Sequence, residues 1–104
     1  MIGLERGNVL PLLEAYEPLL TSRQASIMDS YFRYDLSLGE IAEMEGISRA
    51  GVLDAIKKSI EKLSDYESKL GLVAQKKALL EQIEKIEKGE SSTTSLKEMI
   101  QHGI

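Results

Sequence analysis

Apolar residues recur at spacings of three and four along most of the chain, which is the period of amphipathic helices and not of strands. The first stripe consists of Leu10, Leu13 and Tyr16. We expect Asn8 to cap this helix and Pro11 to lie in its first turn, where a missing amide hydrogen does little harm. Because Pro18 disfavours helical geometry at Glu17, the helix should stop or kink there.

Two capping boxes predict where the next two helices begin. Thr21 is followed by Gln24, and Ser37 by Glu40, so that each pair can satisfy free amides at a helix start. "RYDL" should end the second helix, and Gly46 the third. The inward faces behind the boxes are predicted to carry Ile27, Met28, Tyr31 and Phe32 in the second helix, and Leu38, Ile41 and Ala42 in the third.

The longest stripe begins at Ser48 and predicts a fourth helix of about six turns. Its apolar positions are Val52, Ile56, Ile60, Leu63, Tyr66 and Leu70. Gly71 should bend or end this helix, and the pattern resumes through Val73, Leu80, Ile83 and Ile86 to about Lys88. "GESSTTS" then indicates a polar linker, and "SLKEMIQHGI" either a short helix capped by Ser95 and Glu98 or a frayed end.

The segment "SLGEIAEMEGISRAGV" has the pattern of a helix-turn-helix, two short helices joined by a tight turn. Ala42 is small enough for close helix approach, and Gly46 can adopt a left-handed turn without steric penalty. Ile47 would fill the space beneath the turn, while Val52 and Ile56 anchor the second helix. We therefore predict an all-α fold, with a tri-helical helix-turn-helix core followed by a long C-terminal helix or a helical hairpin.

With 104 residues, 42% of them hydrophobic and 29% charged, the chain is expected to fold as one modest domain with appended helices. We expect a helix-turn-helix domain over residues 1–70, a helical extension over 71–89, and a polar linker with a short terminal helix or tail over 90–104. No run approaches the ~18 apolar residues of a membrane span. The absence of cysteine excludes disulfides and thiolate metal sites, so we expect a cytoplasmic protein.

A basic strip on the second helix of the motif is the candidate nucleic-acid surface, and it comprises Ser48, Arg49, Lys57, Lys58 and Lys62. The net charge is -4, but three arginines against eight acidic residues give -5 in residues 1–46, which leaves +1 for 47–104. The strip can therefore contact phosphates, although Asp54 would repel them. Of these side chains only Arg49 could read a base edge through paired hydrogen bonds. The alternative is that these lysines only keep the outer face of the helix in contact with water and bind no nucleic acid.

Apolar residues beyond Leu63 exceed what three short helices can cover, so we expect a homodimer formed through about residues 60–86. Each large aliphatic residue that becomes fully buried would contribute ~1.5 to 3 kcal/mol. The expected interface consists of Leu63, Tyr66, Leu70, Val73, Leu80 and Ile83. The alternative is that this segment folds back on its own core as an antiparallel hairpin about Gly71.

Chemistry-bearing side chains are sparse. His102 is the one histidine, and no second histidine, cysteine or poised carboxylate pattern surrounds it. We therefore expect no enzyme activity, no metal or other cofactor, and no small-molecule substrate.

Four segments, "LLTSRQ", "SLGEIAEMEGISRAGV", "IKKSIEKL" and especially "DYESKL", resemble the YlxM-type helix-turn-helix proteins. These are small bacterial proteins whose genes neighbour those of the signal recognition particle. The resemblance spans about Leu4 to Lys88, and its middle is also similar to region 4 of sigma factors. In the family's usual Ser-Arg-Gln-Ala-Val pattern, Ala50 and Gly51 stand here in place of the glutamine and alanine.

The resemblance implies a cytoplasmic, all-helical, often dimeric protein with a regulatory part in the signal recognition particle pathway. It would contact the RNA or the protein of that particle through the second helix of the motif. The alternative is a DNA-binding transcription regulator that resembles sigma factor region 4.

Overall fold

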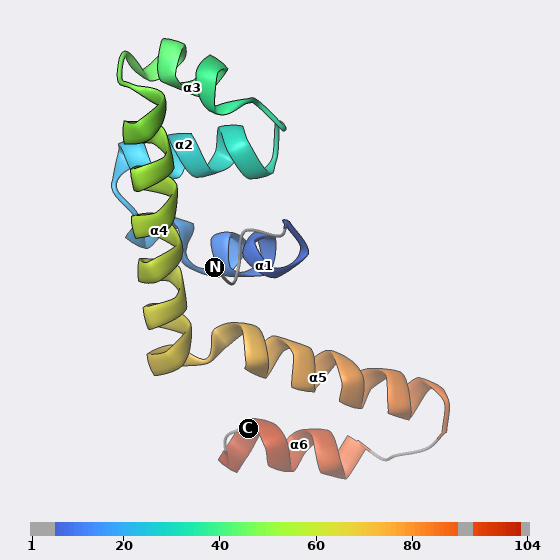
Figure 1. The fold of residues 1–104 in the computed structure, drawn as a ribbon. Coiled ribbons are helices and arrows are strands. Elements are labelled where there is room, and N and C mark those ends of the chain that lie inside the picture. Colours follow the sequence, from blue (N-terminus) through green and yellow to red (C-terminus); the bar gives the residue numbers. More distant parts are fainter. Residues whose placement is uncertain (1–5, 90–92, 103–104) are drawn as a thin grey trace. The chain divides into compact units, whose positions relative to one another are not determined.

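The computed structural model describes residues 6–89 and 93–102, and these form six α-helices, one 3-10 helix and no strand (Figure 1). The all-α class predicted from the sequence is thereby confirmed. The chain divides into two compact units, Met1–Leu70, called unit 1, and Gly71–Ile104, called unit 2. Each unit is described on its own below.

Unit 1 begins with α1 (Arg6–Tyr16), which gives way to the 3-10 turn η1 (Glu17–Leu19) where Pro18 was expected to stop it. The expected cap at Asn8 is wrong, because the chain is already helical at Arg6. Pro11 consequently lies inside the helix and not in its first turn. The helix tolerates this proline because Val9, Leu13 and Tyr16 bury its inner face.

Both capping boxes form as predicted. At the start of α2 (Ser22–Phe32), the Thr21 amide donates to Gln24 Oε1 and the Gln24 amide to Thr21 Oγ1, both at 3.1 Å. At the start of α3 (Leu38–Glu45), Ser37 and Glu40 make the same pair of bonds at 2.9 and 3.1 Å. The Ser37 amide, with the Ser37 hydroxyl as second cause, lowers the pKa of Glu40 below the ordinary glutamate value.

The turn between α3 and α4 (Arg49–Leu70) is a left-handed one at Gly46, whose φ is 69° and ψ 33°. The Gly46 and Ile47 amides both donate to the carbonyl oxygen of Ala42, so the free carbonyl at the end of α3 is satisfied. Ser48 Oγ then accepts from the Gly51 amide at 2.9 Å and caps α4. Helix, turn and helix thus follow from three local signals.

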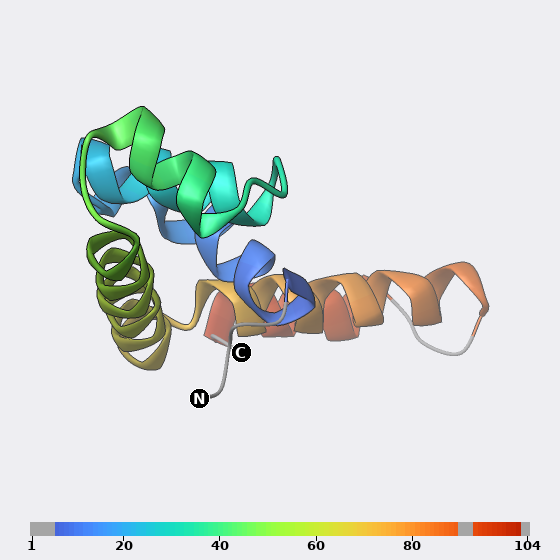
Figure 2. The same cartoon turned by 45° about the horizontal axis from the view of Figure 1, so that its top comes forward.

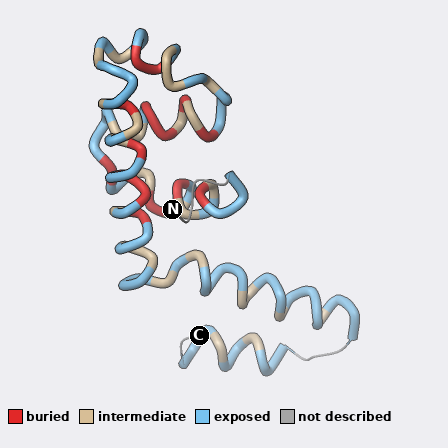
Figure 3. The backbone as a smooth tube through the Cα atoms, in the orientation of Figure 1, coloured by how far each residue is buried: buried red, intermediate tan, exposed pale blue. Residues whose placement is uncertain are grey.

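One face of α4 supplies about a third of the buried residues of unit 1 and packs against α1, α2 and α3 (Figures 1 and 2). The buried positions, red in Figure 3, comprise Val52, Ile56, Ser59, Ile60 and Leu63 of α4, together with Val9, Leu13, Tyr16, Leu20, Ile27, Met28, Ser30, Phe32, Ile41 and Ala42. Among the inward positions expected earlier, Tyr31 and Leu38 are half-buried. Ser59 is buried without penalty, since its hydroxyl donates to the Ala55 carbonyl at 2.7 Å.

Unit 2 consists of α5 (Leu72–Glu87) and α6 (Thr93–His102), which pack against each other. Gly71 ends α4 in the left-handed conformation, with a φ of 63°. The expected cap at Ser95 is wrong, since α6 is already helical at Thr93. Of the linker expected over residues 89–95, residues 93–95 already belong to α6, and residues 90–92 lie outside the described part of the chain. Neither helix of unit 2 buries a residue fully.

Candidate nucleic-acid interface

The helix-turn-helix presents the first turn of α4 at the surface, where Ser48, Arg49 and Ala50 are all exposed. Of the scaffold residues expected from the sequence, Val52 and Ile56 are fully buried, Ala42 is 8% exposed and Ile47 is half-buried. Together with the left-handed Gly46, these residues hold the start of α4 against the end of α3. The position of that first turn is therefore fixed by packing on its inner side.

Arg49 lies across the first turn of α3. A Cβ atom at Gly39 would come within 2.8 Å of Arg49 Nη2 and 3.0 Å of Nε, so the guanidinium occupies the space that a side chain would fill. Arg49 makes no ion pair with another described residue, and its side chain is exposed. Gly39 thus positions a guanidinium on the outer surface of the motif without neutralising it.

The three lysines of the expected strip differ in their side-chain partners. Lys57, two turns after Arg49, is exposed and forms no ion pair within the described ranges 6–89 and 93–102. Lys58 is paired with Asp54 at 3.0 Å. Lys62 is half-buried, and its Nζ donates at 3.2 Å to Gln24 Oε1, the oxygen that caps the Thr21 amide. The structure therefore leaves Arg49 and Lys57 as the cations of α4 that are free to meet a phosphate.

Carboxylates interrupt this surface. Asp54 and Glu61 are exposed on α4, and Glu40 lies at the start of α3 with its pKa lowered, so it is ionised near neutral pH. The face that would approach a nucleic acid is accordingly mixed in sign. Such a face favours binding through a few phosphate contacts and not through an extended positive surface.

Two of the residues expected at a dimer interface serve unit 1 itself. Leu63 is completely buried in the core of unit 1, and the Tyr66 ring lies 5.9 Å from that of Tyr16. The Tyr66 hydroxyl also donates to the Leu19 carbonyl at 3.5 Å. The other four expected residues retain accessible apolar surface, with exposures of 50% for Leu70, 51% for Leu80 and 39% for Ile83, and half-burial for Val73.

Two contacts near the motif could not have been found by local sequence reasoning. The pairing of Lys62 with Gln24 joins residues 38 positions apart, and the contact of Arg49 with Gly39 depends on how α3 and α4 cross. A glycine early in a short helix is the one sequence signal that pointed to the second contact, since glycine is a poor helix former.

Other kinds of site find no support in the part of the chain that the structure describes. It contains no cluster of three or more His, Asp or Glu side chains that could hold a metal ion. His102 is exposed at the end of α6. None of the described helices is both long enough and apolar enough to traverse a bilayer.

Comparison with known families identifies the motif. Residues 5–102 match the model of the UPF0122 family, described as "Putative helix-turn-helix protein, YlxM / p13 like". The chain belongs to this family. The match extends past Lys88, where the resemblance read from the sequence ended, and therefore includes most of unit 2.

Curated relatives support the assignment. A UPF0122 protein of Caldanaerobacter subterraneus subsp. tengcongensis is 47% identical over 75 residues, which cover 72% of this chain and 64% of that protein. Those of Clostridium kluyveri and Limosilactobacillus reuteri are 44% and 43% identical over 77 residues, or 74% of this chain and 69% and 68% of theirs. The chain thus spans somewhat less than two thirds of the first of these relatives.

Substituting Gly39→Ala tests the placement of Arg49. The new methyl group should displace the guanidinium, and because the displaced atoms are the end of a flexible side chain, the fold should survive. Stability should stay equal or rise by up to about 1 kcal/mol, since alanine is the better helix former. The measurements are the NMR shift of Arg49 Nε and urea unfolding followed by tyrosine fluorescence.

In the same spectra the Nε resonance of Arg33, which is paired with Glu17 and Asp29, serves as the internal control. An unchanged Arg49 resonance would refute this description of the contact. A loss of stability larger than about 1 kcal/mol, which is the size of the gain expected from alanine, would also refute it.

Proposed function

We propose that the chain is a cytoplasmic regulatory module of the signal recognition particle pathway, and that the first turns of α4 contact phosphates of the particle's RNA. The observation that carries the proposal is the pair Arg49 and Lys57, both exposed and both without an ion pair among the described residues, on the second helix of a helix-turn-helix. Membership of a helix-turn-helix family supports the binding mode. The resemblance in the sequence leaves the RNA and the protein of the particle open, and the two cations without ion-pair partners favour the RNA because they can meet its phosphates.

The charges favour weak and salt-dependent binding. Phosphate contacts release counterions, and each adds to the steepness with which affinity falls as salt rises. Two free cations give a small number of such contacts, while Lys58 is paired with Asp54 at 3.0 Å. Ala50 and Gly51 offer no hydrogen-bonding side chain to a base edge. A module of this kind positions itself on a folded RNA more readily than it reads a sequence.

A DNA-binding transcription regulator resembling sigma factor region 4 is the second candidate. It is favoured by the shape of the motif, because the second helix of a helix-turn-helix enters the major groove by its amino-terminal end. That end is exposed here and carries Arg49, whose guanidinium can bond to guanine through two parallel hydrogen bonds. Salt dependence separates the two candidates.

Neutralising Arg49 and Lys57 together, as Arg49→Gln with Lys57→Gln, should weaken binding to a bacterial signal recognition particle RNA. The slope of log affinity against log salt should fall by about 2, roughly 1 for each phosphate contact removed. Fluorescence titrations at several salt concentrations, with a random-sequence DNA duplex in parallel, measure both quantities.

The matched control is Lys77→Gln with Lys85→Gln, which removes the same charge from exposed positions of α5. Equal losses in the two double variants would show that net charge alone is responsible. Sequence-selective binding of DNA that persists at about 200 mM salt, where phosphate-dominated binding is already weak, would favour the transcriptional candidate instead.

We also propose that two copies associate through Leu70 and the apolar stripe of α5. The supporting observation is that α6 covers this stripe incompletely, leaving Leu72, Leu80 and Ile83 between 39% and 51% exposed. Burying such residues on association removes apolar surface from water and is favourable. Leu63 and Tyr66, which belong to the packing of unit 1, are no longer part of the proposed surface.

Two leucines of nearly equal exposure give a matched test of the dimer. Leu80→Glu, at a position 51% exposed on α5, should convert a dimer to a monomer, because it places a charge in the proposed interface. Leu19→Glu, at a position 49% exposed in unit 1, should leave the dimer intact. Sedimentation velocity at micromolar concentration measures both, and a monomeric parent chain would refute the proposal.

A further inference from the structure

The outer face of α3 carries an apolar depression bordered by two carboxylates. A surface cavity of about 370 Å³ is lined by Leu36, Glu40, Glu43 and Met44, and we call it the α3 depression. Met44 is 65% exposed, so its apolar side chain is accessible to a partner. Methionine is flexible and polarisable, so it adapts to the surface of a partner more readily than a branched side chain does.

The two carboxylates are available to a partner. Neither Glu40 nor Glu43 forms an ion pair with another described residue, whereas Glu45 accepts from the Ser26 hydroxyl at 3.1 Å and lies 3.8 Å from Arg23. Glu40 uses its carboxylate for the amide of Ser37 and is held in the charged form. Arg49 lies over Gly39, the residue before Glu40.

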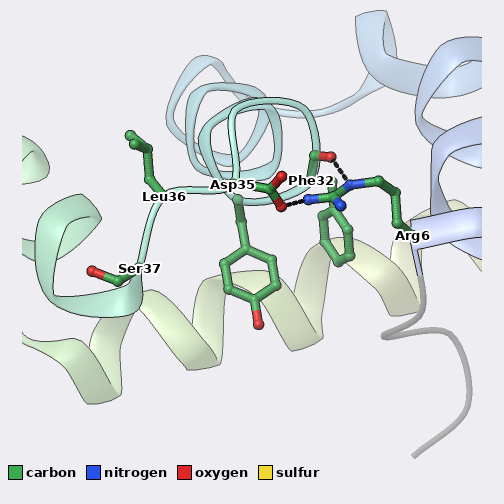
Figure 4. A pocket seen from close by; sticks show the side chains of 6 residues that line it. Arg6, Phe32, Asp35, Leu36 and Ser37 are labelled. Carbon is green, nitrogen blue, oxygen red and sulfur yellow. Dashed lines mark hydrogen bonds and ion pairs between the residues drawn. The ribbon is translucent and has the colours of Figure 1, made fainter.

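The wall of the depression is fixed before any partner arrives. Arg6 donates to the Phe32 carbonyl and pairs with Asp35, which ties the α2–α3 connection to α1 (Figure 4). The Leu36 amide in turn donates to the Ser30 carbonyl at 3.0 Å. Asp35 holds a φ of 55°, a left-handed value that aspartate accepts more easily than most residues. Leu36 is therefore presented by an ordered connection.

The charge of this surface selects the chemistry of its occupant. Two carboxylates repel nucleic acid and anionic lipid, and residues 1–46 carry a formal charge of -5 from three arginines against eight acids. Glu40 and Glu43 are three residues apart on one helix, so their Cβ atoms lie about 5–6 Å apart. Lys or Arg residues three or four positions apart on a second helix have the same spacing and can meet both.

From these observations we infer that the α3 depression docks a basic amphipathic helix of another protein. An apolar side chain of that helix would enter between Leu36 and Met44, while flanking Lys or Arg side chains pair with Glu40 and Glu43. This surface includes Glu40, which also borders the candidate nucleic-acid face beside Arg49, and it adds a protein partner to the nucleic-acid contact proposed above.

The test uses a 14-residue synthetic helix of Leu and Lys in an amphipathic pattern, titrated into the full chain labelled with ¹³C at methionine methyl groups. The Met44 methyl resonance should shift on binding, while that of Met28, which is fully buried, should not. Glu40→Gln with Glu43→Gln should weaken binding about 2- to 30-fold, as expected for the loss of two exposed ion pairs. Glutamine at position 40 keeps the capping box.

The matched control, Glu61→Gln with Glu84→Gln, removes the same charge from exposed positions elsewhere and should bind as the parent chain does. The inference is overturned if Met44 does not shift, if only Met99 of α6 shifts, or if the control loses as much affinity as the test variant. Equal binding of a peptide with Glu in place of Lys would also overturn it.

Two further outcomes separate this inference from the proposed function. A shift of Met44 caused by raising the protein concentration alone would assign the surface to a second copy and refute the heterologous partner. A shift of the Met44 resonance on addition of signal recognition particle RNA would assign the surface to nucleic acid and would also refute the heterologous protein partner. Loss of RNA binding in the Arg49 and Lys57 double variant, with peptide binding unchanged, is the result expected if both proposals hold.

Discussion

The left-handed turn at Gly46 is the constraint on which the rest of the structure depends, because it lets α3 and α4 share one core although they are adjacent in the chain. A residue with a Cβ pays a steric cost in this conformation, and the chain has a glycine at the position that needs it. Once the turn is made, Val52, Ile56 and Leu63 all face inward and are completely buried. The side chains that this packing leaves at the surface are the ones that can contact a partner.

The inner face of α4 is buried in the core of unit 1, so only the outer face of this helix is available to a partner. Lys62 donates a hydrogen bond to Gln24 of α2, and Lys58 is paired with Asp54. Arg49 forms neither kind of contact, because Gly39 leaves room for its guanidinium on the surface of α3. The chain thus combines a negative net charge with two cations, Arg49 and Lys57, that have no described ion-pair partner, on a helix surface that also carries Asp54 and Glu61.

Local signals in the sequence predicted the fold well. The capping boxes at Thr21 and Ser37 and the turn at Gly46 each involve residues within four positions, so their geometry is encoded by neighbours. The caps at Asn8 and Ser95 failed for the converse reason. Either residue can cap a helix, but in α1 the packing of Val9 and Leu13 carries the helix past Asn8, and α6 begins two residues before the expected cap, within the usual uncertainty of a helix end.

The candidate sites could be predicted only in part. An apolar stripe shows that a residue seeks burial, but it does not show which partner buries it, and Leu63 was therefore assigned to a second copy when unit 1 already covers it. The exposed position of Arg49 follows from the helix period, whereas its contact with Gly39 requires the crossing of two helices. The α3 depression likewise depends on Leu36, which lies outside any helix.

Unfolding of Gly46 variants measures the central constraint most directly. A Cβ at Gly46 would meet no atom within 4 Å, so Gly46→Ala probes backbone strain alone and should destabilise unit 1 by about 1 to 2 kcal/mol. Gly46→Asn should cost less, because asparagine tolerates the left-handed region. All four tyrosines lie between residues 16 and 66, so their fluorescence during urea unfolding reports on unit 1. An alanine variant as stable as the parent chain would contradict the account.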